Sequence, residues 1–385
     1  MEKQQKVLNR IKSVGTTGSG SVLGTKNNDE CYTSMQDILN ELSYWASLGK
    51  FNGKKIVCPC DWDVTDDKDI YGIEIDYKED PAEISAFKSV KSVKITKVVE
   101  YPGTLFETSS EIKEESVETK LVEYELREDE IEDFLRDKLT CNFVRTLTQN
   151  ARRWGIKSIT ASGYNPATDR GIKFQDVDYS KYDICITNPP FSLYPEFMKR
   201  IVGNIEFIVL APFLNRANPS IGLPLMLQHI YLGKGRELAL DFVNPTKENK
   251  YNSKKVACDW LVSWDDAQKE VNKNYHGSGI KYELYKDEYV EMSNMTMKDG
   301  TNPIRVPSKL FPEDYDGWMF CSINILDHVN QDEYEWYGTH FIGYYNKVNP
   351  SANPFLSKAS DTMLIDANGQ HCFAGIVFRK KKKVD

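Results

Sequence analysis

The fold is decided by residues 182–193, YDICITNPPFSL, in which a short apolar run stops at two prolines. The apolar run Ile184–Ile186 has no helical spacing, which indicates a buried parallel strand. Pro189 and Pro190 have no backbone N–H group, and Pro190 favours an extended conformation at Pro189. The sequence therefore predicts a strand that ends in a stiff loop with outward-facing carbonyl groups.

This loop combines two hydrogen-bond acceptors with an aromatic ring. The Asn188 side-chain oxygen and the Pro189 carbonyl can hold an exocyclic amino group, and Phe191 can stack on the ring that carries it. An enzyme that methylates an amino group needs this combination. The alternative interpretation is an ordinary turn at the end of a strand, because Asn-Pro and Pro-Pro are common turn dipeptides.

The composition is that of an ordinary globular protein. The 385 residues suffice for two domains, or for one with insertions, and a hydrophobic content of 40% supplies a core. No apolar run approaches the length of a membrane span and the N-terminus has no apolar signal region, so we expect a cytoplasmic protein. The eight cysteines include no Cys-x-x-Cys pair, which predicts reduced core thiols instead of disulfides or a metal site.

The negative charge is concentrated in one segment. The net charge of the chain is −8, but residues 61–140 alone contain 24 acidic and 11 basic side chains. The rest of the chain therefore holds 33 acidic and 38 basic side chains. A mildly basic remainder is compatible with a surface that contacts phosphate groups.

Three features precede the acidic segment. Residues 1–28 predict a flexible N-terminal segment, because their glycines follow no strand and precede no Gly-Lys-Ser/Thr. A helix is expected to begin after Ser34 and to end at Gly49, and its apolar face consists of Ile38, Leu42, Trp45 and Leu48. Residues 55–61 predict a first buried strand that ends at Asp61, and ligands of doubly wound sheets bind at such strand ends.

The alternation of strands and helices is interrupted at residues 66–140 and then resumes. We interpret 66–140 as an acidic insertion that forms a small β-rich lobe. A helix is predicted from Phe143 to a stop at Gly155, followed by a strand at 156–161. Beyond 182–193 the pattern predicts helices at 193–202 and 223–232 and strands at 205–210, 237–243 and 256–262. This order predicts an α/β fold with a doubly wound, mostly parallel sheet.

Four stretches resemble the EcoRI-type family of adenine-specific DNA methyltransferases. Residues 29–33, DECYT, are similar to the family's Asp-Glu-Phe-Tyr-Thr, and Cys60-Asp61 is similar to its Cys-Asp-Asp. Residues 188–193, NPPFSL, are the strongest match. Residues 315–319, YDGWM, resemble a C-terminal block that is widespread in adenine methyltransferases; Asn330 and Tyr334-Glu335 extend this block.

The resemblance implies a Rossmann-like methyltransferase sheet that binds S-adenosylmethionine and methylates the 6-amino group of an adenine flipped out of duplex DNA. It implies catalytic roles for Asn188, Pro189, Pro190 and Phe191. It also implies cofactor contacts from Asp29, Tyr32, Thr33, Cys60, Asp61, Asn142 and Phe143. Asp176 is a further candidate for the cofactor's adenine, with a solvated aspartate as the alternative.

The chain also departs from the family pattern. In the family, Asn-Phe follows the first strand closely, but here Asn142-Phe143 comes after the insertion. The strand at 156–161 ends without the acidic residue that often binds the ribose hydroxyls of the cofactor. Two alternatives therefore stay open: an N-methyltransferase that acts on RNA or on a protein glutamine, and a catalytically inactive DNA-binding relative.

The domain plan and the partners follow from this resemblance. We expect a methyltransferase core at 29–65 and 141–264, and a target-recognition and C-terminal region at 265–385. The expected partner is double-stranded DNA, with a companion restriction endonuclease as a second possibility; a monomer is slightly favoured. Candidate DNA contacts are Arg216, Lys247, Lys250, Lys254 and Lys255. For the lysine run at 380–383, a frayed solvated tail is preferred over a phosphate-binding segment.

Overall fold

The computed structural model describes most of the chain. The described residues are 33–64, 70–77, 84–100, 113–127, 131, 134–135, 139–166, 168–217, 219–226, 228–236, 238–242, 254–339, 345–346, 350–356, 364–372 and 375–382. The chain divides into two compact units. We call the described residues of 29–210 and 240–256 the core unit, and those of 211–239 and 257–385 the C-terminal unit. The predicted N-terminal segment at 1–28 lies outside the described residues.

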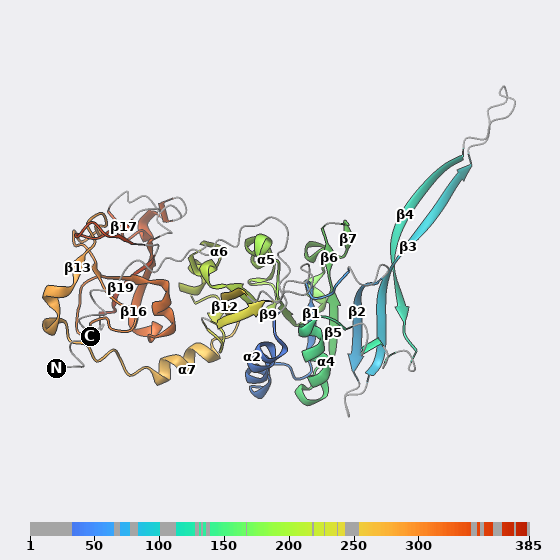
Figure 1. Ribbon diagram of the computed structural model, residues 1–385, viewed down its shortest axis with the longest axis horizontal. Helices are drawn as coiled ribbons and strands as arrows, with labels where there is room; N and C mark the ends of the chain where they lie inside the picture. The colour runs from blue at the N-terminus through green and yellow to red at the C-terminus, as the bar shows by residue number, and fades with distance from the viewer. Residues whose placement is uncertain are drawn as a thin grey trace, which may run out of the picture. The chain divides into compact units, whose positions relative to one another are not determined.

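A mixed sheet forms the centre of the core unit (Figure 1). Its strands follow one another across the sheet in the order β9-β8-β1-β5-β2-β3-β4. Strands β5, β1, β8 and β9 are parallel, whereas β2, β3 and β4 are antiparallel to their neighbours. The bounds are β1 Lys55–Cys58, β2 Ile70–Tyr77, β3 Ile84–Glu100, β4 Lys113–Glu125, β5 Ser158–Ser162, β8 Ile184–Thr187 and β9 Glu206–Pro212, with a small hairpin of β6 Tyr164–Asn165 and β7 Arg170–Gly171. The fold is thus α/β, and the predicted strands at 55–61, 156–161, 184–186 and 205–210 are confirmed.

The helices of the core unit begin and end close to their predicted signals. Helix α2 (Met35–Ser47) is capped by Ser34, whose Oγ accepts a hydrogen bond from the Asp37 N–H at 3.2 Å. Helix α4 (Asn142–Trp154) ends at Gly155, which has a left-handed φ of 66°. Helix α2 packs against α4, and α5 (Tyr194–Ile201) follows β8. One detail was wrong: Leu48 is 45% exposed, because it follows the last helical turn.

The insertion at 66–140 contributes strands to the same sheet. β2 pairs with β5 along five residues, from Gly72 opposite Ser162 to Asp76 opposite Ser158. β3 pairs with β2 and then runs on with β4 as a two-stranded ribbon that leaves the rest of the sheet (Figure 1). The insertion is β-rich over its described residues, as predicted, and main-chain hydrogen bonds connect its strands to the core sheet.

The C-terminal unit contains a second, five-stranded sheet in the order β13-β14-β15-β19-β16. Its core includes Met292, Met297, Trp318, Phe320 and Val377. The strands are β13 Val290–Glu291, β14 Ile304–Arg305, β15 Met319–Ser322, β16 Tyr334–Gly338 and β19 Gly375–Lys380, with a hairpin of β17 Leu364–Ile365 and β18 His371–Cys372. The longer helix of this unit is α7 (Asp266–Asn274). Short 3-10 helices of this unit include η4 Phe213–Ala217, η7 Ile323–Asp327 and η8 Gln331–Glu333, and those of the core unit include η1 Phe174–Asp176 and η3 Phe191–Leu193.

The helix predicted at 223–232 was misplaced. Helix α6 spans Pro219–Met226, and Tyr231–Leu232 forms the short strand β10, which pairs with β12 (Lys254–Val262). Gln228 has a positive φ of 57°, which ends the helical path, and the His229 N–H donates to the Pro224 carbonyl at 2.8 Å. The predicted strands at 237–243 and 256–262 correspond to β11 (Leu238–Phe242) and β12.

Two expectations about basic residues were wrong. Arg216 is 2% exposed and lies between Asp259 and Asp327, so it cannot reach DNA in this conformation. The lysine run is not a frayed tail over its described part: Lys380 ends β19, and the Lys381 N–H donates to the Glu333 carbonyl at 2.9 Å. Among the other candidate DNA contacts, Lys247 and Lys250 lie outside the described residues, and Lys254 and Lys255 lie at the start of β12.

Within the described part of the chain, no helix has the length and apolar character needed to cross a bilayer. The described cysteines carry free thiols. Four of them, Cys58, Cys60, Cys141 and Cys185, lie close together in the core unit, where burial raises the pKa of each thiol well above its usual value. These thiols are therefore protonated and unreactive at neutral pH.

Candidate active site

The direction of the chain through the sheet reverses between β1 and β8. From β1 the chain passes through β2, β3 and β4 and then forms β5 on one side of β1, before it returns to β8 on the other side. All three strands are parallel, so their carboxyl ends meet at one edge of the sheet. Such a reversal leaves a crevice beyond the strand ends where doubly wound sheets bind ligands. The residues that follow β1 and β8 are therefore the first candidates for a site.

Asp61 follows β1 and is the buried acid of this edge. It is 5% exposed, and its N–H donates to the Ser162 carbonyl at 3.0 Å, which fixes the loop after β1 to the end of β5. Burial raises the pKa of the Asp61 carboxyl to about 7, although hydrogen bonds from the Thr187 hydroxyl, the Asn188 backbone N–H and the Cys141 thiol each lower it. Asp61 therefore lies next to the end of β8, and its charge changes near neutral pH.

Three buried oxygen atoms at this edge form no hydrogen bond of ordinary geometry with a described residue, although the Thr187 hydroxyl lies close enough to the Asp61 carboxyl to lower its pKa. They are Asp61 Oδ2, Thr187 Oγ1 and Thr33 Oγ1. Their residues are 5%, 0% and 2% exposed, respectively. An unsatisfied buried oxygen costs about 1–3 kcal/mol, so Thr33 and the Asp61–Thr187 pair are candidates for hydrogen bonds with a polar ligand.

The N-terminus of α4 connects the loop before α2 to Asp61. Asn142, the first helical residue, donates its side-chain N–H to the Thr33 carbonyl at 2.8 Å. Cys141 precedes it as the N-cap residue, and the Cys141 Sγ lies 3.6 Å from Asp61 Oδ1. The insertion between Asp61 and Asn142 in sequence therefore does not separate them in space.

The Asn-Pro-Pro-Phe stretch follows β8 at the same edge. Asn188 is half-buried and Pro189 buried. Pro190 has an extended conformation with φ −60° and ψ 126°, and its carbonyl accepts from the Leu193 N–H at 3.0 Å. The Pro189 carbonyl accepts no backbone hydrogen bond from any described residue. Phe191 is half-buried and begins η3.

The structure brings several of the predicted site residues close to one another. Asn142 contacts Thr33, Asp61 lies beside Cys141 and the Asn188 backbone, and Cys60 directly precedes Asp61. Phe143 is 2% exposed on the buried face of α4. Asp176 is exposed in η1. The predicted cofactor residues Asp29 and Tyr32 lie outside the described residues.

Sequence reasoning missed Thr187 and Cys141. Thr187 is the last residue of β8 and directly precedes Asn188, so the rule that strand ends carry ligand-binding groups could have found it. Cys141 is adjacent in sequence to the predicted Asn142. No sequence pattern indicates that its thiol faces Asp61, because the two residues are 80 positions apart.

Comparisons with protein-family models, curated proteins and solved structures find no match. Among the described residues, no group of three or more His, Cys, Asp or Glu side chains is placed to hold a metal ion. A functional assignment therefore depends on the chemistry of the residues at the β1 and β8 strand ends.

Proposed function

We propose that this protein is an S-adenosylmethionine-dependent DNA methyltransferase that modifies the 6-amino group of adenine. One observation supports this most directly: Asn188-Pro189-Pro190-Phe191 follows β8 next to the buried Asp61 that follows β1. The two stretches carry the catalytic and cofactor-binding parts of the resemblance, and they come from strands on either side of the chain reversal.

The unsatisfied oxygen atoms fit the proposed cofactor. S-adenosylmethionine carries hydroxyl, amino and carboxylate groups, and when bound it supplies an electrophilic methyl group on sulfur. The Asp61 carboxylate can accept hydrogen bonds from such a ligand, and the Thr33 and Thr187 hydroxyls can donate or accept them. Asn142 acts on this region indirectly, because its amide holds the Thr33 carbonyl.

The loop after β8 suits the amine that receives the methyl group. The Asn188 side-chain oxygen and the Pro189 carbonyl accept the two N–H bonds of the 6-amino group, which orients the nitrogen lone pair away from them. The rigid Pro189-Pro190 backbone keeps these acceptors in place. Phe191 stacks on the flipped base and offsets part of the cost of unstacking it, which is a few kcal/mol.

The test measures transfer of a labelled methyl group from S-adenosylmethionine to duplex DNA, to RNA and to protein. We expect labelling of duplex DNA, with the product identified as N6-methyladenine. Asn188→Ala and Phe191→Ala should each reduce transfer at least about 100-fold, the scale of losing a positioning or electrostatic contact. Both variants should still show a cofactor-dependent thermal shift. Asn274→Ala, at an exposed residue of α7, is the matched control and should keep full activity.

Other outcomes point to the alternatives. Labelling of RNA or of a protein glutamine, without labelling of duplex DNA, would identify that molecule as the substrate. Absence of any thermal shift with S-adenosylmethionine in the unmodified protein would favour an inactive DNA-binding relative. Unchanged turnover in both Asn188→Ala and Phe191→Ala would contradict the assignment of the catalytic loop.

A further inference from the structure

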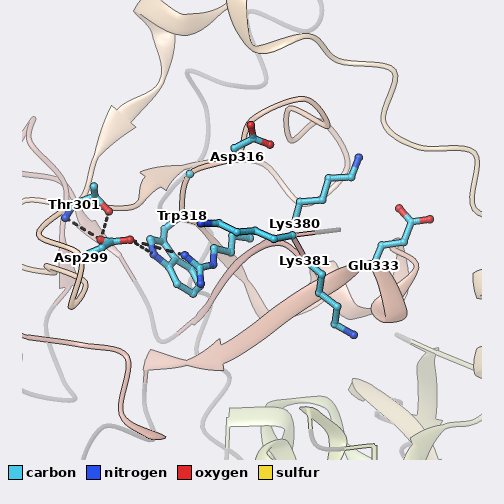
Figure 2. A pocket seen from close by; sticks show the side chains of 10 residues that line it. Asp299, Thr301, Asp316, Trp318, Glu333, Lys380 and Lys381 are labelled. Carbon is cyan, nitrogen blue, oxygen red and sulfur yellow. Dashed lines mark hydrogen bonds and ion pairs between the residues drawn. The ribbon is translucent and has the colours of Figure 1, made fainter. Parts of the chain in front are cut away.

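The C-terminal unit contains an open pocket of about 1160 Å³ (Figure 2). It lies far along the chain from the Asn-Pro-Pro-Phe loop and is built from the block at 315–319 and the lysine run. Its lining residues are Asp299, Thr301, Asp316, Gly317, Trp318, Glu333, Arg379, Lys380, Lys381 and Lys382. The pocket therefore joins two stretches that the proposed methyl transfer does not use.

One wall of the pocket is a fixed guanidinium group. The Arg379 guanidinium lies over the Trp318 ring at 4.1 Å, and Arg379 Nε donates to Glu335 Oε2 at 3.0 Å. Asp299 lies 3.9 Å from the Arg379 guanidinium and accepts hydrogen bonds from Trp318 Nε1 at 2.9 Å and from the Thr301 hydroxyl at 2.6 Å, so Arg379 is paired with two carboxylates. An arginine held flat in this way keeps its remaining N–H groups in a constant direction.

The lysine run forms an ordered edge of the same pocket. The N–H of Lys381 extends the β16–β19 pairing, and its Nζ donates to the Asp332 carbonyl at 2.8 Å. Lys380 Nζ lies 3.4 Å from the Glu313 carbonyl. Figure 2 shows the side chains of Lys380 and Lys381 on opposite sides of the extended chain, as expected for successive residues of a strand.

These ammonium groups keep their charge available. All three lysines are exposed, and among the described residues none of them forms an ion pair with a carboxylate. Carbonyl groups orient Lys380 and Lys381 without neutralising them. Three carboxylates, Asp299, Asp316 and Glu333, also line the pocket, and Figure 2 shows Glu333 on the same side as Lys380 and Lys381.

We propose that the lysine edge of this pocket, Lys380–Lys382, binds the phosphate backbone of duplex DNA. Exposed cations at three successive positions of the chain suit a ligand whose negative charges repeat along a line. The identity of the partner rests on the proposed function. Such contacts position a duplex and carry no sequence information themselves.

The test compares two triple variants in binding a fluorescein-labelled duplex of arbitrary sequence. Lys380→Gln, Lys381→Gln and Lys382→Gln are combined in one protein, and Lys269→Gln, Lys281→Gln and Lys286→Gln in the other. The control lysines are exposed in the same unit and lie outside the pocket. Anisotropy is measured between about 50 and 200 mM salt, because each phosphate contact contributes about 0.9 to the slope of log K against log salt.

We expect the pocket variant to lose about 2 to 3 from the magnitude of this slope and at least about tenfold in affinity. The control variant should keep the slope of the unmodified protein. Replacing the three pocket lysines by arginine should also keep it, which separates loss of charge from loss of fold. Equal slopes in the pocket variant and the unmodified protein, or an equal loss in the control, would overturn the proposal.

The same proteins are assayed for methyl transfer at saturating DNA, so that the two proposals fail separately. If the protein methylates adenine but the pocket variant has the same salt slope as the unmodified protein, the proposed phosphate contacts are contradicted and the proposed function is not. If the pocket variant has a reduced salt slope but the unmodified protein does not methylate DNA, the phosphate contacts are supported and the proposed function is contradicted.

Discussion

Asp61 is a carboxyl group whose charge depends on its surroundings. Its pKa of about 7 lies well above the usual 3.8, and burial is the largest cause. A folded state that binds a proton more tightly than the unfolded chain loses stability as pH rises through the interval between the two pKa values. The unliganded protein should therefore lose stability between about pH 4 and pH 7 through this one group.

Asp61→Asn should abolish this contribution. The difference in free energy of unfolding between the variant and the unmodified protein should grow by about 2–3 kcal/mol in favour of the variant as the pH rises from about 5 to about 8. One pKa unit corresponds to about 1.4 kcal/mol. Urea unfolding at a series of pH values measures the difference. Asp176→Asn, at an exposed residue of η1, is the control and should follow the unmodified protein at every pH. If the free energy of unfolding depends on pH in the same way for Asp61→Asn and for the unmodified protein, the raised pKa of Asp61 is contradicted.

Individual residues also show what could and could not be predicted from the sequence. Asp61 and Asn188 could be located because each follows an apolar strand, and the carboxyl ends of parallel strands share one edge. The charge of Arg216 indicated a surface contact, yet this side chain is buried. Sequence gives the charge of a residue, whereas its partners, here Asp259 and Asp327, come from positions 43 and 111 residues away.

Helix ends were predicted correctly where a neighbouring residue marks them, and incorrectly where they depend on residues without a local signal. Ser34 and Gly155 lie where their capping roles predict. Helix α6 was misplaced because its end depends on Gln228, a residue type that rarely adopts a positive φ and so gives no local signal. Helix boundaries are thus readable where glycine or a capping side chain marks them.

Arg216 joins three elements of the C-terminal unit. It extends from η4 to Asp259 on β12, with contacts at 2.6 and 2.7 Å, and to Asp327 at the end of η7, with contacts at 2.7 and 2.9 Å. Arg216→Ala should lower the free energy of unfolding by about 3–5 kcal/mol, because it leaves two buried carboxylates without their cation. Chemical denaturation followed by tryptophan fluorescence measures this loss.

Lys234→Ala provides the comparison for Arg216→Ala. Lys234 Nζ lies 2.8 Å from Glu270, but both side chains are more than 40% exposed. Solvent screens such a pair, so the loss should stay below about 1 kcal/mol. Similar losses for the two variants would mean that the buried ion pairs do not hold these elements together.

The central sheet of the core unit includes strands from residues 66–140, the segment that the sequence predicts as an insertion. The acidic composition of 66–140 indicated an insertion, but its composition carries no information about pairing. Gly72 to Asp76 could be placed against β5 only by the three-dimensional register. The chain can therefore leave the core after Asp61 and return at Asn142 without separating the two halves of the site.

The ribbon beyond this pairing should be dispensable for the site. Lys91 and Val122 lie opposite each other in β3 and β4, so residues 92–121 can be replaced by an Asn-Gly turn, which suits a two-residue hairpin loop. The pairing of β2 with β3 and β5 stays intact, as do β1, β8 and Asp61. The shortened protein should melt within about 4 °C of the full chain, equivalent to about 1 kcal/mol. It should also keep its thermal shift with S-adenosylmethionine, because a ligand that binds only the folded state raises the melting temperature. Loss of that shift at unchanged stability would mean that the ribbon itself contributes to ligand binding.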